Sequence, residues 1–218
     1  MRIHLKIRSS QERVPFDHQS LLTGTIHKWM GWNDEHGKVS LYSFSQIEGG
    51  KASSDGLQFP EQTCLFFSSF YPDLIKRIIE GIQSDPTMFF GLTVSEIIIQ
   101  DNPDLSDRNL FYPASPIFIK RRVGEREDHI LYNDLRADDC LKETLLTRMA
   151  KAGLSDESLM IRFDVNYPKS GTKKITYNEI HNRASWCPIL IEAKPETKLF
   201  AWNVGLGNST GIGFGAIK

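Results

Sequence analysis

The chain has 218 residues, of which 40% are hydrophobic and 24% charged, and 26 Lys and Arg against 27 Asp and Glu give a formal net charge of −1. This composition is typical of a soluble globular protein with one large domain or two small ones. No apolar run reaches the length of a membrane-spanning helix, and the start of the chain alternates apolar with basic residues, so we expect neither membrane insertion nor secretion. The near-neutral charge excludes a global attraction to nucleic acid, so any RNA contact requires a local basic patch.

The three cysteines, Cys64, Cys140 and Cys187, lie far apart in the sequence. Their number and spacing exclude a disulfide framework and a paired-cysteine zinc site. We therefore expect a cytoplasmic protein that needs no disulfide or metal to hold its fold.

The first hundred residues predict a β-α-β-β-α-β order. Residues 2–8 alternate as in a half-buried strand, and Asp17 is the expected N-cap of a helix over 18–32. Pro72 is expected in the first turn of a second helix that stops before Ser84. Strands are expected within 37–47, from 59 to 67, and over 88–99. The outer face of the first strand is basic and carries Arg2, His4, Lys6 and Arg8.

This order is ferredoxin-like, and a second, less regular copy of it follows the turn-rich stretch 101–107. The fold class we predict is α+β, with tandem ferredoxin-like (RRM-like) domains over 1–103 and 104–218 and a glycine-rich loop near the C-terminus. The expected elements of the second copy are a strand around 117–119, a helix over 138–152 with Gly153 as its C′ residue, strands at 159–166 and 189–191, a helix from Pro195 to near Gly205, and a last strand over 214–217.

Residues 205–215 contain five glycines. Glycine at this density allows close approach of the backbone to a ligand. Dinucleotide-binding and phosphate-binding glycine loops precede a helix, and only three residues follow Gly215, so a Rossmann or P-loop enzyme is excluded. The segment is therefore either a tight connection that needs glycine or a contact to an extended ligand.

Three patches of sequence resemble one family. The segment GLGNSTGIGFGAIK over 205–218 resembles the C-terminal glycine-rich signature of the CRISPR-associated endoribonucleases, RAMP-superfamily enzymes that cut precursor CRISPR RNA within its repeats. The run from Val14 to Ser45 resembles the N-terminal pattern of that family, with VPFDHQ at its start and LYSFS at its end. Ser115-Pro116-Ile117 resembles its second-half strand opening. The resemblance implies a tandem ferredoxin-like fold, an RNA substrate and no cofactor.

The resemblance implies metal-independent cleavage, in which the ribose 2′-OH attacks the adjacent phosphate and leaves 2′,3′-cyclic phosphate and 5′-OH ends. This step needs a base, an acid and a cation. Histidine serves the first two roles near pH 7. The resemblance places His36 and His27 in these roles, without showing which is base and which is acid. Lys38 is the nearest candidate for the cation, although the lysine position of the family falls on Ser40. Lys28 is the second candidate for this role.

Basic clusters and the glycines are the expected RNA contacts, and each basic cluster is equally compatible with a solvated strand end. Arg2, Lys6 and Arg8 would extend this track. His18 is expected to anchor the start of the first helix. The predicted RNA-binding residues are Lys120, Arg121, Arg122, Lys169, Lys173, Lys174, Gly205, Gly207, Gly211 and Gly213.

The leading hypothesis is thus a cytoplasmic endoribonuclease whose partner is CRISPR repeat RNA, with no membrane partner and no cofactor. Proteins of a CRISPR effector complex and a second copy of the chain are the further partners considered. The first alternative is a non-cleaving RNA-binding subunit of an effector complex. An unrelated tandem ferredoxin-like ligand-binding protein and a zinc site at His27 and His36 are weaker alternatives.

Overall fold

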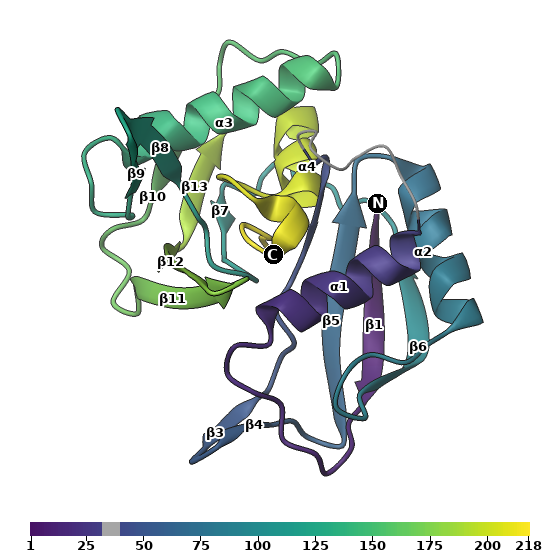
Figure 1. Ribbon diagram of the computed structural model, residues 1–218. Coiled ribbons are helices and arrows are strands. Elements are labelled where there is room, and N and C mark those ends of the chain that lie inside the picture. Colours follow the sequence, from purple (N-terminus) through teal and green to yellow (C-terminus); the bar gives the residue numbers. More distant parts are fainter. Residues whose placement is uncertain (32–39) are drawn as a thin grey trace.

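The computed structural model describes residues 1–31 and 40–218, and its elements gather in two lobes (Figure 1). In the first lobe a four-stranded antiparallel sheet has the order β2-β5-β1-β6. Helices α1 (Gln19–Met30) and α2 (Pro72–Ser84) cover one face of this sheet. The order matches the predicted ferredoxin-like topology. The strands are β1 (Arg2–Arg8), β2 (Tyr42–Phe44), β5 (Gln62–Ser69) and β6 (Thr93–Gln100), with a small hairpin of β3 (Lys51–Ser53) and β4 (Gly56–Gln58).

Hydrophobic periodicity explains the first lobe. Ile3, Leu5 and Ile7 of β1 are fully buried, as the alternation predicts. Helix α2 buries its apolar stripe against the same core, and its N-terminal turn contains the predicted proline. The strand expected over 88–99 begins later, at Thr93, and the run from 37 to 47 forms only the short strand β2 among the described residues.

The second lobe repeats the same strand order. Its sheet has the order β10-β13-β7, and residues 112–114 pair on their free side with residues 216–218 at the end of the chain. Tyr112 and Lys218 exchange two backbone hydrogen bonds of 2.8 Å. Gly153 follows the first of its helices as the predicted C′ residue, with φ +73°. The elements are β7 (Leu110–Phe111), α3 (Ala137–Lys151), β10 (Met160–Phe163), β13 (Ile189–Glu192) and α4 (Pro195–Val204).

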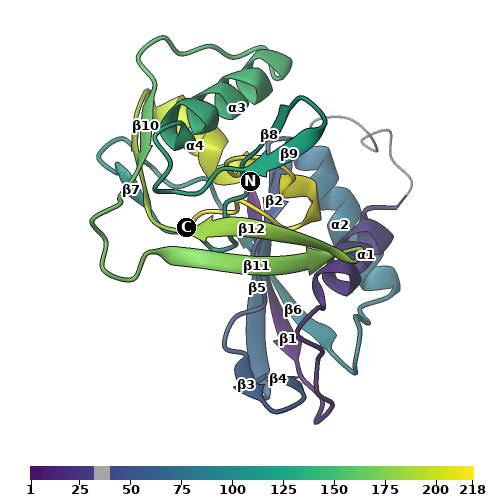
Figure 2. The same cartoon turned by 60° about the vertical axis from the view of Figure 1, so that its left-hand side comes forward.

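Two hairpins extend from the second lobe. The first joins β8 (Lys120–Val123) to β9 (Arg126–His129), and the second joins β11 (Gly171–Tyr177) to β12 (Ile180–Trp186). Figure 2 shows the second hairpin reaching across to α1 of the first lobe. There the Ser20 hydroxyl donates to Asn178 Oδ1 at 3.2 Å and accepts from the Asn178 N–H at 3.1 Å. A long-range contact therefore fixes the tip of this hairpin.

Three predictions need correction. Residues 117–119 do not form a sheet strand; Ile117 and Phe118 make isolated bridges, because the second sheet takes its first strand from β7. The N-cap of α1 is His18 and not Asp17. The final segment 214–217 pairs through an isolated bridge at Ile217 and is too short to register as a strand.

The two lobes have separate hydrophobic cores. One cluster runs from Ile3 to Val94, and the other contains Leu105 to Ile217 together with Leu41. The division into domains 1–103 and 104–218 remains a prediction, which these two cores support. No helix in the described part of the chain is long and apolar enough to cross a membrane.

Arg2 joins the lobes, and this corrects its predicted place on an exposed basic face. Its side chain is 2% exposed and lies between the Phe66 and Trp202 rings, with the guanidinium carbon 3.7 and 3.4 Å from their centroids. It donates to the Trp202 and Ile217 carbonyls at 2.7 and 2.8 Å. Strand alternation predicts which side chains leave the core, and here the second lobe covers the face to which Arg2 points. Lys6 and Arg8 are exposed.

Candidate active site

Helix α1 makes contacts through two faces. Leu22 and Ile26 are fully buried in the first core. On a neighbouring row, Gln19 Nε2 and Thr23 Oγ1 both donate to the Ile212 carbonyl, at 2.9 and 3.2 Å. Ile212 ends the short 3₁₀ helix η1 (Thr210–Ile212) of the glycine-rich segment. The helix that carries His27 is therefore docked on the glycine-rich segment of the second lobe.

His27 is half-buried at this contact. Its Nε2 atom lies 3.2 Å from the Gly211 carbonyl oxygen and 3.3 Å from the Tyr42 hydroxyl. The Tyr42 hydroxyl also donates to the Gly211 carbonyl at 3.3 Å. A carbonyl oxygen only accepts hydrogen bonds, so the Gly211 contact is a hydrogen bond when Nε2 carries a proton. Two groups thus orient the imidazole.

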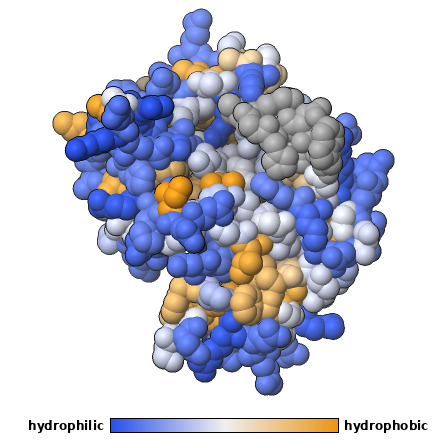
Figure 3. Space-filling view, viewed as in Figure 1, coloured by the Kyte–Doolittle hydropathy of each residue, from blue (hydrophilic) through white to orange (hydrophobic). Residues whose placement is uncertain are grey.

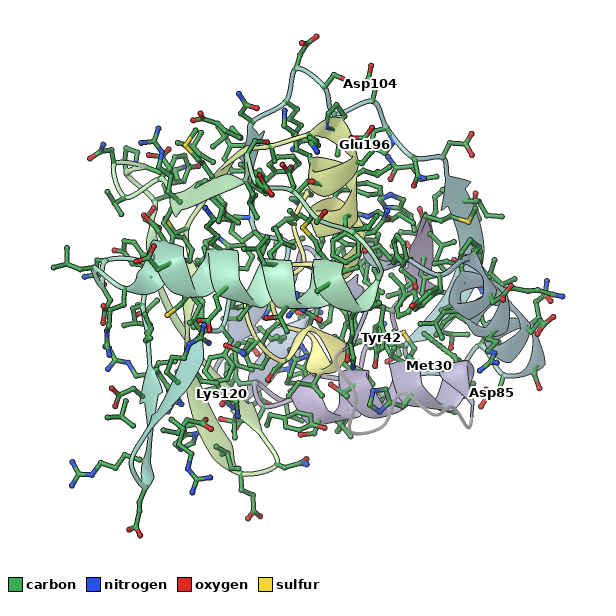
Figure 4. All side chains as sticks on the ribbon, turned by 90° about the horizontal axis from the view of Figure 1, so that it is seen from above. Met30, Tyr42, Asp85, Asp104, Lys120 and Glu196 are labelled. Atoms are coloured by element: carbon green, nitrogen blue, oxygen red, sulfur yellow. The ribbon has the colours of Figure 1, made fainter. Side chains whose placement is uncertain are left out.

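Tyr42 is a site residue that the sequence interpretation missed. It is 4% exposed in β2 and stacks on Phe67 at a ring distance of 5.4 Å. Figure 4 shows it between α1 and the glycine-rich segment. Its place in the LYSFS pattern marks a strand, and only the pairing of β2 at the sheet edge brings its hydroxyl to His27. The sequence contains no local signal for that contact.

Gly211 and Gly213 permit the close packing. A Cβ on Gly211 would lie 2.3 Å from Ser40 Oγ and 3.0 Å from the Tyr42 hydroxyl. A Cβ on Gly213, where φ is +90°, would lie 2.1 Å from Gln19 Nε2. Only glycine brings the backbone this close to α1 and β2.

Gly205 and Gly207 are held from the other side by α3. The Arg148 guanidinium donates to the carbonyls of both residues, at 2.9 Å for Gly205. Arg148 is 5% exposed, and burial lowers the pKa of its guanidinium to about 10. All four predicted glycines are buried at the junction of the lobes. Their contact with RNA stays a prediction, and their close packing explains why glycine occupies these positions.

His36 and Lys38, the other predicted catalytic residues, lie outside the described residues. Lys28, the second candidate for the cation, has structural partners. Its Nζ atom lies 2.8 Å from Asp85 Oδ2 and donates to the Thr87 carbonyl at 2.6 Å. This contact, with hydrogen bonds from Thr87, holds the pKa of the Asp85 carboxyl well below its usual range. Lys28 thus ties α1 to the turn after α2.

His18 anchors the start of α1, as predicted. Its Nδ1 atom contacts the Pro15 carbonyl at 2.9 Å, and its ring packs against Phe59 and Phe89 at 6.4 and 6.2 Å. Burial lowers the pKa of His18, against the opposing effect of its backbone contacts. These neighbours assign it a structural role.

The first predicted basic cluster is largely paired. Lys120 lies 2.9 Å from Glu127, and Arg121 lies 2.6 Å from Glu143 of α3. Arg122 is exposed and donates only to the Gly124 carbonyl among the described residues, at 3.2 Å. Figure 4 shows Lys120 on the hairpin side of the glycine-rich segment, away from α2. Arg122 therefore offers the least neutralised charge of the three.

The second predicted cluster lies on and beside the β11–β12 hairpin. Lys169, Lys173 and Lys174 are exposed, and Lys173 Nζ lies 5.9 Å from the Trp186 ring centroid. Lys174 pairs across the hairpin with Arg183. The strand register therefore concentrates positive charge on one hairpin.

A cavity of about 880 Å³ between the lobes brings part of this cluster together with aromatic side chains. Lys173 and Lys174 line it beside Phe59 and Trp186. Phe59 is buried and Trp186 is partly exposed, and lysines beside a partly exposed aromatic ring suit the backbone and bases of a single nucleic-acid strand. Figure 3 shows hydrophilic side chains over much of the visible face and an apolar patch in its lower half. Two acidic residues, Asp17 and Glu48, also line the cavity, and Glu48 pairs with Lys218 at 2.8 Å.

Two ferredoxin-like lobes joined through a buried glycine-rich segment place this protein in the class of tandem ferredoxin-like proteins. Its structure is similar to a solved CRISPR-associated protein Cas6, with a TM-score of 0.85, 21% identity, and 100% of this chain and 98% of the other covered. It is also similar to a solved RAMP protein described as binding different RNA substrates, with a TM-score of 0.84, 22% identity, and coverage of 100% and 98%. These likenesses confirm the predicted fold.

Residues 100–218 match the family model of the C-terminal part of CRISPR-associated protein Cas6. The chain therefore belongs to the Cas6 family. It is 25% identical to a putative CRISPR-associated endoribonuclease-like protein Cas6 of Pyrococcus furiosus, over 100% of this chain and 98% of that protein. The family resemblance seen in the sequence is confirmed.

Proposed function

We propose that this chain is an endoribonuclease that cuts precursor CRISPR RNA within its repeats without a metal ion. The ribose 2′-oxygen forms a bond to the adjacent phosphorus, and the bond from phosphorus to the 5′-oxygen breaks. A base takes the 2′-OH proton, and an acid gives a proton to the departing 5′-oxygen. The products carry a 2′,3′-cyclic phosphate and a 5′-OH. His27 and His36 are the proposed acid and base, with Lys38 as the nearby cation.

The placement of His27 is the observation that carries this proposal. Its imidazole lies where α1 meets the glycine-rich segment, and Gly211 and Tyr42 contact Nε2 at 3.2 and 3.3 Å. A ring held in one orientation is what proton transfer to a positioned substrate requires. Membership of the Cas6 family supports RNA processing as the reaction class.

The proposed RNA path includes the cavity between the lobes. Lys173 and Lys174 would contact phosphates there, and Trp186 would offer a face for a base. Arg122 and Lys169, both exposed, would extend the path on the second lobe. Each phosphate contact makes binding weaker at higher salt, so a variant that lacks one lysine should show a shallower salt dependence.

A cleavage assay tests the proposal. End-labelled RNA with the repeat sequence of the organism's own CRISPR array is incubated with the protein in EDTA, and the product ends are analysed. We expect one cut with a 2′,3′-cyclic phosphate. His27→Ala and His36→Ala should each lower the cleavage rate by about 10²- to 10⁴-fold. Tyr42→Phe, which keeps the ring and removes the hydroxyl, should lower it by about tenfold because the orientation of His27 loosens.

The control variant is His4→Ala, because His4 lies on β1 and contacts Gln100 at 2.7 Å. Its rate should equal that of the wild type. Tight binding without cleavage would replace the proposal by the non-cleaving RNA-binding subunit. Cleavage that stops in EDTA, or products without a cyclic phosphate, would contradict the proposed mechanism.

A further inference from the structure

A second cavity lies between α3 and the glycine-rich segment, and Thr210, the neighbour of Gly211, lines it. Its volume is about 570 Å³, within the range of small-ligand sites. Ser40 lines it, and a Cβ on Gly211 would lie 2.3 Å from Ser40 Oγ. Gly211 thus links the two places, since its carbonyl oxygen contacts His27 and its α-carbon lies beside Ser40, which lines the cavity.

Three consecutive side chains on one wall have unused hydrogen-bonding groups. Thr210 is 2% exposed, and its hydroxyl has no hydrogen-bond partner among the described residues. The Asn208 side-chain oxygen accepts the Lys120 N–H at 2.9 Å, which turns the amide NH₂ group away from that contact. Within the described chain neither this NH₂ group nor the Ser209 hydroxyl donates a hydrogen bond, and both residues line the cavity. Buried polar groups are normally paired, so an unpaired buried hydroxyl at a cavity points to an absent ligand.

Arg121 and Glu143 also line the cavity. Their side chains meet at 2.6 Å, and Arg121 also donates to the Cys140 carbonyl at 3.3 Å. The cavity is therefore lined by two guanidiniums, hydroxyls and an amide NH₂ as donors and by one carboxylate as acceptor. Arg121 already pairs with Glu143, and Arg148 donates to the Gly205 and Gly207 carbonyls, so neither guanidinium is free for a bare phosphate. A nucleobase edge, which carries acceptors and amino groups together, matches this mixture.

We propose that this cavity binds one nucleotide of the RNA, next to the bond that is cut, and reads its base. The inference rests on the proposed function, because the RNA is the ligand. Thr210 and Asn208 donate to the base edge, and the Arg121–Glu143 pair also lines the site. The cavity thereby fixes which nucleotide stands beside His27, so it sets the cleavage position.

Thr210→Val is the decisive variant, because it has the same shape as threonine and lacks the hydroxyl. Removing an unpaired buried hydroxyl should raise the Tm of the free protein by about 2–4 °C. Losing a hydrogen bond to RNA should weaken binding of the repeat RNA by about fivefold to tenfold. The matched control is Thr25→Val, since the Thr25 hydroxyl donates to the Leu21 carbonyl at 2.9 Å within α1. This control should leave RNA affinity unchanged.

An abasic scan locates the nucleotide. Repeat RNAs in which one nucleotide at a time near the cut is abasic are titrated against the wild type, Thr210→Val and Asn208→Asp. We expect one abasic position to weaken wild-type binding, and we expect Thr210→Val to lose no further affinity with that RNA. Asn208→Asp keeps the oxygen that accepts from Lys120 and removes the NH₂ donor, so it should show the same non-additivity.

The outcomes separate the two proposals. If the wild type binds and cuts the RNA but no abasic position weakens binding more in the wild type than in Thr210→Val, the nucleotide pocket is refuted and the endoribonuclease stands. If the wild type binds no repeat RNA, both are refuted. If the protein binds RNA with the expected non-additivity and does not cut it, the pocket stands and the cleavage mechanism falls.

Discussion

Arg148 is a buried cation whose partners are backbone oxygens. Its guanidinium contacts the carbonyls of Gly205 and Gly207, and desolvation lowers its pKa to about 10. The charge remains at neutral pH, so each hydrogen bond is charge-assisted. The conformation of the glycine-rich segment thus depends on a side chain that lies about 60 residues earlier in the chain. Because this side chain is buried, water cannot take its place as donor to the two carbonyls.

Replacing Arg148 by methionine should destabilise the protein. Methionine fills much of the volume but leaves two carbonyls without donors, at a cost of about 3 kcal/mol. Urea unfolding followed by circular dichroism measures this difference. Arg162→Met is the control, because Arg162 is exposed and its only ion pair with a described residue, Glu192, is 3.9 Å long. Equal losses in the two variants would contradict the role assigned to Arg148.

His18 should make stability depend on pH. Burial lowers its pKa in the folded protein below the ordinary value of 6.5, so the unfolded chain binds the proton more tightly. The contribution of neutral His18 is fully present above pH 6.5. It is lost as the pH falls through the lower folded pKa.

A comparison with His18→Asn isolates this effect, because the asparagine amide can replace Nδ1 as donor to the Pro15 carbonyl. The free energy of unfolding, measured in urea at intervals from pH 7.5 to pH 5, should fall more steeply for the wild type. Parallel curves for the two proteins would show that His18 does not titrate with the predicted sign.

Elements of the fold differ in how far the sequence predicts them. Strand β1 and helices α2 and α3 carry long regular patterns, and their positions follow from those patterns. Strand β7 has two residues, too few for a period to show. Its place in the sheet depends on β13 and on the end of the chain, which are distant in sequence.

The residues of the candidate active site likewise differ in how far the sequence predicts them. His27 is predicted as a candidate because its row on α1 is polar and because the family pattern places it there. Tyr42 reaches His27, 15 residues away in the sequence, and Thr210 reaches the cavity only through tertiary structure. For Arg2 the sequence predicts an exposed side chain that the fold buries. Strand alternation predicts the face of the sheet on which Arg2 lies, but it cannot predict that Trp202 covers that face.

One glycine of α1 and one of the glycine-rich segment should respond oppositely to alanine. Gly24 lies inside α1, and a Cβ there would meet nothing within 4 Å. Gly24→Ala should therefore stabilise the protein by about 1 kcal/mol and raise its Tm by about 2–4 °C. A Cβ on Gly213 would lie 2.7 Å from the Phe44 ring, so Gly213→Ala should lower Tm.

Differential scanning calorimetry measures both changes. Equal effects of the two substitutions would mean that α1 does not pack on the glycine-rich segment as described. A lower Tm for Gly24→Ala alone would indicate that the exposed face of α1 is covered in solution.

The whole molecule depends on contacts that cross between its lobes. Arg2 of β1 reaches Trp202 in α4 and the Ile217 carbonyl, while α1 reaches the Ile212 carbonyl. The first and last elements of the described chain therefore support one another. The candidate active site is complete in neither lobe alone, because His27 and Tyr42 come from the first lobe and Gly211 from the second.

Arg2→Lys should loosen this junction. Lysine keeps the charge but loses the planar stacking between Phe66 and Trp202 and one fork of donors. We expect a loss of about 2–3 kcal/mol and a broader thermal transition as the lobes begin to unfold separately. Arg8→Lys, at an exposed position on the same strand, should change neither quantity. A single sharp transition with an unchanged midpoint in Arg2→Lys would contradict this role of Arg2.

The position of the glycine-rich segment near the end of the chain has a consequence for biosynthesis. Residues 205–217 leave the ribosome after α1, β2 and α3 have already been made, yet they provide the neighbours of His27, Tyr42 and Arg148. A nascent chain therefore cannot assemble the site while it is still short of these residues. Under the proposed function, a chain that stops before residue 205 is therefore expected to be inert toward RNA cleavage.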